Sequence, residues 1–143
     1  MPETHISHLG IAVRDLDAAI KLWSVLLGGE PELITVVPDQ KVRVAVFARG
    51  VSDTGGRIEL VAPTSPDSPI AKFLHNRGEG LHHVCIYVEN LDHRLNELTS
   101  AGVRLIDTVP RIGAEGNRIA FVHPIGTGGV LLELEEKSHD NSD

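Results

Sequence analysis

The chain lacks several features that would each point to a particular class of protein. It has one cysteine, Cys85, so no disulfide can form within the chain, and a reducing compartment suits it. Its 13 lysines and arginines are outnumbered by 20 aspartates and glutamates and form no basic block, which disfavours nucleic acid and anionic membrane as partners. No apolar run approaches the about 20 residues that cross a bilayer, and the first residues show no signal-peptide pattern. We therefore expect a cytoplasmic protein that binds neither nucleic acid nor membrane.

What the sequence does contain is an internal repeat. HLGIAVRDLD begins at His8, and HVCIYVENLD begins at His83, 75 positions later, with ten positions aligned without a gap. RIELVAP, which contains Glu59, is echoed 74 positions later by LLELEEK, which contains Glu133. Because the two offsets agree within one residue, we interpret the 143 residues as one domain made of two copies of one module. The predicted modules span about 5–63 and 78–136, with a short helical linker at 64–77 and a frayed tail at 137–143.

Each module has the same order of predicted elements, β-α-β-β-β. Alternating residues after His8 and after His83 predict a strand, and Asp15 and Asn90 are expected to cap the helices that follow. A four-stranded sheet with a helix on one face leaves its other face open. We therefore predict an α+β fold in which the two sheets pair into a half-open, roughly eight-stranded, barrel-like sheet. The later strands are expected at 32–37, 42–49 and 57–62 in the first module, and at 103–106, 118–123 and 129–135 in the second.

Strand parity selects the residues that face the open side. Neighbouring side chains of a strand point to opposite faces, so the aliphatic row of the first strand faces the helix while His8 faces the open side. By the same alternation His83, and not its neighbour His82, faces the open side in the second module. Glu59 and Glu133 each alternate with core aliphatics, and a buried carboxylate must be paired or bound to a metal. Either glutamate alone also fits a solvent-facing strand position, but two glutamates at the same module position favour one shared site.

Two histidines and two glutamates related by an approximate two-fold axis form a set of two imidazoles and two carboxylates. Such a set suits Zn²⁺, Co²⁺, Ni²⁺, Mn²⁺ or Fe²⁺, and the residues do not choose among them. The remaining coordination positions would be open to water or substrate oxygens, as a catalytic site requires. The sequence therefore predicts a divalent-metal site made of His8, Glu59, His83 and Glu133.

Four longer stretches add a resemblance to a known family. They are HLGIAV, RIELVAP with the following DSPIAKFL, GEGLHHVCIYV, and PRIGAEGNRIAFVHPIGTGGVLLELE, of which the last is the most specific. Together they resemble the methylmalonyl-CoA epimerase family of the vicinal oxygen chelate superfamily, which also contains glyoxalase I, and the resemblance covers the chain from about His8 to Glu135. It implies the glyoxalase fold, a homodimer, a CoA thioester substrate and a divalent metal at the four positions just named. Co²⁺ is the metal that the resemblance favours, with Mn²⁺, Zn²⁺ and Ni²⁺ as alternatives.

The reaction implied by the resemblance is the interconversion of (2R)- and (2S)-methylmalonyl-CoA through a metal-stabilised enolate. Removal of the weakly acidic proton at C2 needs a base, and we assign that role to Glu133, while the metal acts as a Lewis acid. Some bacterial members of the family have a glutamate, thought to be the second acid/base, where this chain has Val44. We therefore expect Glu59 to serve the second face of C2, with water or Glu115 as the alternatives.

The stretch RIGAEGN precedes a predicted strand and contains two glycines. Glycine lets backbone N–H groups approach an oxyanion or a thioester carbonyl, although an ordinary turn would look the same. The resemblance favours substrate contact. The residues expected to bind substrate are Gly113, Ala114, Glu115, Gly116, Asn117 and Arg118.

Three other functions fit parts of this pattern. A glyoxalase I-type lyase acting on a thiol hemithioacetal would use the same four ligands, so the metal site does not separate it from an epimerase. A metal-free small-molecule-binding protein on the same fold would bind no metal, which elemental analysis tests. An extradiol dioxygenase ranks last, because it would need a triad of two histidines and one carboxylate and usually a longer chain.

Overall fold

The computed structural model describes residues 5–47 and 56–137, and the chain divides into two compact units. The N-terminal unit is His8–His82. The C-terminal unit is His83–Asp143 together with the first segment, Met1–Ser7. The unit boundaries therefore fall directly before His8 and directly before His83, the two positions at which the sequence repeat begins.

The N-terminal unit contains a four-stranded sheet with the order β2-β3-β4-β1. Strands β1 and β4 are parallel, and the β2–β3 and β3–β4 pairs are antiparallel. Asp15 caps α1 as predicted, because its carboxylate accepts a hydrogen bond from the Ala18 N–H at 3.1 Å. The elements are β1 (Ile6–Ala12, of which His8 onward belongs to this unit), α1 (Leu16–Leu27), β2 (Leu33–Val37), a 3-10 turn (Pro38–Gln40), β3 (Val42–Phe47), β4 (Arg57–Pro63) and α2 (Pro69–Arg77).

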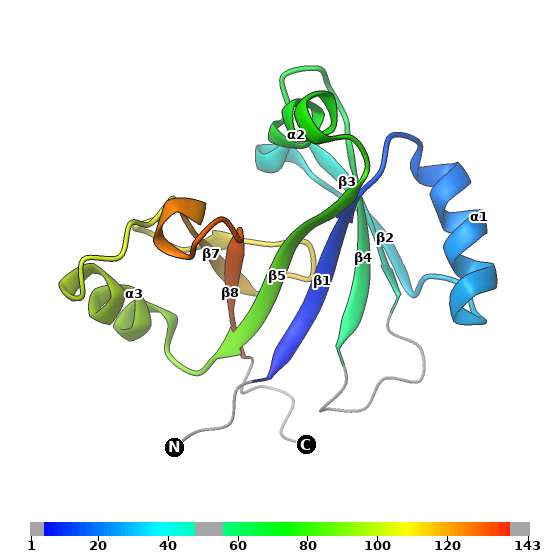
Figure 1. The fold of residues 1–143 in the computed structure, drawn as a ribbon. Coiled ribbons are helices and arrows are strands. Elements are labelled where there is room, and N and C mark those ends of the chain that lie inside the picture. The colour runs from blue at the N-terminus through cyan, green and yellow to red at the C-terminus, as the bar shows by residue number, and fades with distance from the viewer. Residues whose placement is uncertain (1–4, 48–55, 138–143) are drawn as a thin grey trace, which may run out of the picture. The chain divides into compact units, whose positions relative to one another are not determined.

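Helix α1 covers one face of this sheet (Figure 1). Val13 belongs to the buried cluster beneath the helix and Ile11, which is partly buried, packs against it, so the aliphatic row that begins in β1 does face α1, as the alternation predicted. The face of β1 that carries His8 is therefore turned away from α1. The buried members of the cluster are Val13, Leu16, Ala45, Phe47, Leu60 and Ala62.

The C-terminal unit repeats this arrangement with the sheet order β5-β8-β7-β6. Strands β5 and β8 are parallel, as β1 and β4 are. Asn90 caps α3 by accepting a hydrogen bond from the His93 N–H at 3.1 Å. Helix α3 lies beside this sheet (Figure 1), and its Leu91 and Leu95 are buried in one cluster with residues of β7 and β8. The elements are β5 (Gly80–Val88, of which His83 onward belongs to this unit), α3 (Leu91–Ser100), β6 (Arg111–Ile112), β7 (Arg118–Val122), a 3-10 turn (Pro124–Gly126) and β8 (Leu132–Glu136).

One predicted strand of this unit differs. The strand expected at 103–106 is reduced to a single bridge between Leu105 and Val122 of β7, and β7 also pairs with the short strand Arg111–Ile112. The reason is a side chain: the Asp107 carboxylate accepts a hydrogen bond from the Phe121 N–H at 2.8 Å. A short polar side chain that bonds the backbone competes with ladder formation, so regular pairing stops there.

Smaller differences concern the ends of segments. Strand β8 begins at Leu132 and not at Gly129, because Gly129 has a φ of 111°, which a strand residue does not adopt. Lys137 donates its N–H to the Val88 carbonyl at 2.8 Å, while the rest of the expected tail, 138–143, and the last two positions of the strand expected to end at 49 lie outside the described residues. None of the helices in 5–47 and 56–137 is long and apolar enough to cross a membrane.

Candidate metal centre

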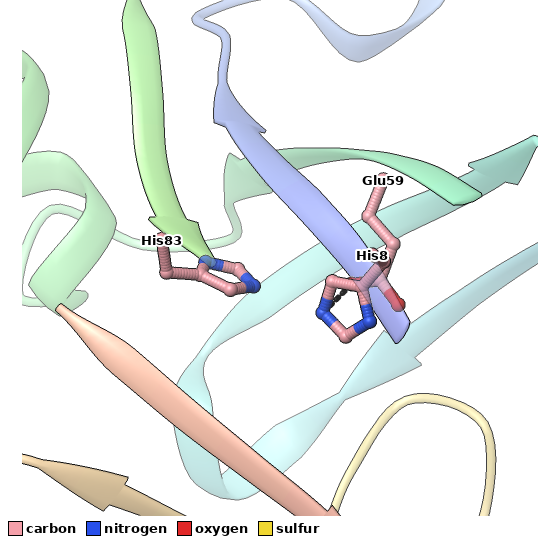
Figure 2. Close-up of side chains that lie close together, drawn as sticks. All are labelled: His8, Glu59 and His83. Carbon is pink, nitrogen blue, oxygen red and sulfur yellow. Dashed lines mark ion pairs between the residues drawn. The ribbon is translucent and has the colours of Figure 1, made fainter. Parts of the chain in front are cut away.

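His8 and Glu59 form a buried pair in the N-terminal unit. They come from the neighbouring parallel strands β1 and β4, and Nε2 of His8 lies 3.4 Å from Oε1 of Glu59 (Figure 2). The residue opposite Glu59 in the β1–β4 register is Gly10. Because Gly10 has no side chain, nothing on β1 at that level competes with the carboxylate for the space beside it.

His83 and Glu133 form the matching pair in the C-terminal unit. They come from the parallel strands β5 and β8, and Nε2 of His83 lies 3.2 Å from Oε1 of Glu133. Figure 2 shows the His83 side chain leaving β5. Its ring packs edge-on against Phe121, with the ring centroids 6.0 Å apart. Phe121 lies opposite Glu133 in the β7–β8 register, so one aromatic side chain borders both members of the pair.

The two pairs occupy the same place in their sheets. In each unit the glutamate lies opposite the residue two positions after the histidine, which is Gly10 for Glu59 and Cys85 for Glu133. The four side chains are all buried, with exposures between 3% and 6%. Core packing gives no reason to bury an acid at the same register position twice, so the equivalence indicates one common role.

Within each pair the atoms are spaced as ligands of one divalent cation would be. Two ligand atoms about 2.1 Å from an ion, at angles of about 90–110°, lie about 3.0–3.4 Å apart. The two measured N···O separations, 3.4 Å and 3.2 Å, fall in this range. All four residues are among the described side chains that could hold a metal ion. The positive charge of such an ion would offset the cost of burying two carboxylates. The donor set therefore fits a divalent metal.

His82 and His83 have different surroundings, as the alternation predicted. The His82 ring is partly exposed and packs edge-on against Phe73 of α2, with ring centroids 4.8 Å apart. Of the two neighbours, only His83 is buried beside a carboxylate. The environment of His82 is that of a packed histidine on the helix side of its strand.

The glycine loop, Arg111–Asn117, closes on itself. The Gly113 N–H donates to the Asn117 carbonyl at 2.9 Å, and the Gly116 N–H donates to the Gly113 carbonyl at 3.1 Å. Gly116 has a φ of 85°, in the left-handed region that favours glycine. The two glycine N–H groups are therefore used within the loop, and substrate contact would fall to the other groups of the loop.

Arg118 is bound to two carboxylates of the protein. Its guanidinium contacts Asp92 at 3.0 Å and Glu136 at 3.1 Å. These hydrogen bonds, the one to Asp92 first, raise the pKa of Arg118 above its ordinary value. Glu136 also accepts the Leu91 N–H at 2.9 Å, so the network fixes the start of α3. Arg118 thus anchors a helix, which leaves the loop residues 113–117 as the better candidates for substrate contact.

The chain is similar to known proteins over most of its length. Residues 7–121 match the model of the Glyoxalase/Bleomycin resistance protein/Dioxygenase superfamily. The ethylmalonyl-CoA/methylmalonyl-CoA epimerase of Cereibacter sphaeroides is 38% identical over 133 residues, which are 92% of this chain and 96% of that protein.

Solved structures agree over the same length. The methylmalonyl-CoA epimerase of Mycobacterium tuberculosis has a TM-score of 0.88 and 40% identity, covering 95% of this chain and 89% of that one. A variant of the Streptomyces coelicolor methylmalonyl-CoA epimerase, solved with 2-nitronate-propionyl-CoA, also has a TM-score of 0.88, with 34% identity over 96% of this chain and 97% of that one. The chain belongs to the methylmalonyl-CoA epimerase family. The family, the α+β glyoxalase fold of two βαβββ modules, and an enzyme of the epimerase type, all predicted from the sequence, are confirmed.

Val44 occupies the position at which the family resemblance leads us to expect a glutamate in some bacterial members. The side chain is buried on β3, opposite Val61 of β4, and has no group that can carry a proton. Among the described residues of the N-terminal unit, Glu59 is the carboxylate that is buried. It therefore stays the candidate for the second acid/base of this family member.

Sequence reasoning missed Glu135, a second buried acid on β8. It follows Glu133 by two positions, so both side chains lie on the same face of the strand. Oε1 of Glu135 accepts a hydrogen bond from Oγ of Ser7 at 2.5 Å, and Oε2 accepts one from Nδ2 of Asn117 at 2.5 Å. The alternation in LELE could have identified Glu135, because it is two positions after Glu133 and so faces the same side of the strand. A carboxylate oxygen of Glu115 lies within 4.8 Å of one of Glu135.

Proposed function

We propose that the protein is a metal-dependent methylmalonyl-CoA epimerase, in which His8, Glu59, His83 and Glu133 meet at one divalent cation. The observation that carries this proposal is the repeated pair: a histidine beside a buried glutamate at the same register position in both sheets. The substrate is proposed from the relatives, since proteins of this name match nearly the whole chain in sequence and in structure. Solved relatives hold CoA thioester compounds, which supports a CoA thioester as the small-molecule partner.

A cation at this donor set supplies Lewis-acid stabilisation of the negative charge that develops on the substrate oxygen when the C2 proton leaves. In one direction Glu133 would take the proton from one face of C2, and protonated Glu59 would deliver a proton to the other face, since Val44 has no group that can do so. In the reverse direction the two glutamates exchange these roles. The residues of the glycine loop orient the acyl group.

Two further parts of the proposal come from the family resemblance. Co²⁺ is the proposed native metal, and Mn²⁺, Zn²⁺ and Ni²⁺ also suit two imidazoles and two carboxylates. The proposed working form is a homodimer.

The test is exchange of solvent deuterium into C2 of methylmalonyl-CoA, followed by NMR or mass spectrometry. We expect exchange and epimerisation by the metal-loaded protein, loss of both after chelation, and recovery on addition of Co²⁺. A glyoxalase I-type thiol hemithioacetal serves as the control substrate and should not turn over. Exchange that persists after complete removal of metal, or turnover of the hemithioacetal alone, would contradict the proposal.

A further inference from the structure

We propose that Glu135 is a positioning residue that ties the glycine loop Arg111–Asn117 to the residue preceding His8. The inference rests on the proposed function, because that function assigns the loop to the substrate and His8 to the metal. Glu135 acts through its hydrogen-bond partners and is not itself assigned a contact with substrate. The partners, Ser7 and Asn117, belong with Glu135 to the C-terminal unit.

Three donors converge on the Glu135 carboxylate. Oγ of Ser7 and Nδ2 of Asn117 each donate at 2.5 Å, one to each carboxylate oxygen. Sγ of Cys85, a weaker donor, lies 3.7 Å from Oε1. Ser7, Cys85 and Glu135 are at most 2% exposed, so water does not compete for these bonds. Charge-assisted bonds to both oxygens hold the two donor groups in one geometry.

Packing alone does not require a carboxylate at this position. Glu135 lies opposite Tyr87 on β5 and opposite Ile119 on β7. An apolar side chain between these neighbours would avoid the cost of removing a charge from water. The carboxylate is therefore explained by what it holds in place, and each of its two strong donors leads to a different part of the proposed site.

The hydrogen bond from Asn117 connects Glu135 to the glycine loop. Asn117 is the last residue of the loop, and its carbonyl accepts the Gly113 N–H that closes it. With its side chain held by Glu135, Asn117 is fixed at both its backbone and its side chain. The loop is then presented in one conformation, which lowers the entropy lost when substrate binds.

The Ser7 contact leads to the metal ligand. Ser7 directly precedes His8 in β1, and the segment before it is also held by a hydrogen bond from the Tyr87 N–H to the His5 carbonyl at 3.0 Å. Fixing Ser7 limits the movement of His8. Strand β8, which carries Glu133, thus holds through Glu135 the residue that directly precedes a second proposed ligand.

The test separates the two contacts with single substitutions. Ser7→Ala should weaken metal retention about 10-fold, measured by competition with a chelating dye, and should leave the KM of the Co²⁺-saturated enzyme unchanged. Asn117→Ala should raise the KM for methylmalonyl-CoA about 10-fold and leave metal retention unchanged. Glu135→Leu should show both effects where it folds, and the two single variants keep the test valid where it does not.

The decisive experiment exchanges the amide and the carboxylate between positions 117 and 135. Asn117→Asp alone places two carboxylates against each other and should raise KM more than Asn117→Ala does. Adding Glu135→Gln restores the hydrogen bond, with the amide at position 135 as the donor and the carboxylate at position 117 as the acceptor, so the double variant should regain most of the lost affinity for substrate. A double variant no better than Asn117→Asp would overturn the proposal.

Glu136→Gln is the matched control, since Glu136 is the neighbouring acid and contacts Arg118 and α3 instead. It should lower Tm without changing metal retention or KM. If Ser7→Ala and Asn117→Ala likewise lower only Tm, Glu135 is purely structural and the proposal fails. Metal retention and Tm are measured without turnover, so the Ser7→Ala result can be read separately from failure of the epimerase assignment, which would appear as an inactive wild type.

Discussion

The two units hold the same histidine–glutamate pair but differ in what surrounds it. In the N-terminal unit Gly10 lies opposite the glutamate, and the sheet ends with the five-residue strand β2. In the C-terminal unit Cys85 lies opposite the glutamate, a second buried acid follows on the same strand, and β6 has only two residues because a loop takes its place. What the units share is the donor set for a metal, and what differs is the part of the site that would handle substrate.

The largest expected effect is loss of metal when either pair loses its histidine. His8→Ala and His83→Ala should each reduce metal affinity by more than about 100-fold, because removing a ligand costs more than removing a supporting contact. His82→Ala is the control and should retain metal, since its ring packs against Phe73. Metal content after gel filtration measures all three. Equal loss from His82→Ala would show that the strand register has been misassigned.

The next largest effect concerns the C-terminal glutamate. Glu133→Gln should lower the epimerisation rate by about 10²–10⁴-fold, because an amide still reaches the metal but cannot accept a proton. Coupled assays of epimerisation, with metal content measured in parallel, test this. A variant that keeps its metal and turns over normally would show that Glu133 is a ligand and not a base.

The N-terminal glutamate should behave differently if it serves the opposite face of C2. Glu59→Gln is expected to cut epimerisation heavily while metal stays bound, and to leave deuterium exchange into one C2 epimer partly intact. The comparison variant is Glu115→Gln, which tests the glycine-loop acid as the second group. Near-normal turnover of a metal-loaded Glu59→Gln enzyme would assign the second face to water or to Glu115.

Much of this comparison could be predicted from the sequence because it depends on local order. The repeat offset, the strand alternation and the caps at Asp15 and Asn90 are properties of neighbouring residues, and they place His8, Glu59, His83 and Glu133 correctly on their strands. The features that were missed join residues far apart. Ser7 and Glu135 are separated by 128 positions, and no periodic pattern encodes such a contact.

The same reason explains the remaining differences. In the sequence Arg118 is a basic residue beside a glycine loop. In the structure its guanidinium donates hydrogen bonds to Asp92 and Glu136, which lie 26 and 18 positions away. The Asp107 side chain stops strand pairing through a bond to the Phe121 N–H. Pattern analysis identifies which face a residue occupies, whereas it does not identify the polar partner that the residue finds there.

The helices of the two units also differ on their outer faces. Helix α1 exposes Leu22, Val25 and Leu26, with Val25 81% exposed, whereas α3 exposes mainly polar side chains. A homodimer that covers the outer face of α1 would account for these residues. Val25→Glu should then shift the protein from dimer to monomer in light scattering at micromolar concentration, with Arg94→Glu on α3 as the control. A wild type that is already monomeric would remove the dimer proposal.

The smallest expected effect compares the surface ion pairs of the two units. The Asp67 carboxylate accepts hydrogen bonds from the Lys41 ammonium and the Ser65 hydroxyl. These bonds, the one from Lys41 contributing most, lower the pKa of Asp67 to about 2. A lowered pKa in the folded state adds stability above the ordinary pKa of 3.8, and this stability is lost as the pH falls through about 2. Because the pair is exposed, Asp67→Asn should lower Tm by a few degrees at most near pH 7, and less at high salt. Below about pH 2 the difference in Tm between wild type and Asp67→Asn should vanish.

Asp92→Asn, which breaks the contact of Arg118 with α3, should have the larger effect on Tm at pH 7. The reason is that Arg118 is also joined to Glu136, which holds the start of the helix. Equal Tm shifts for the two variants would show that the additional contacts of the C-terminal network add nothing to stability.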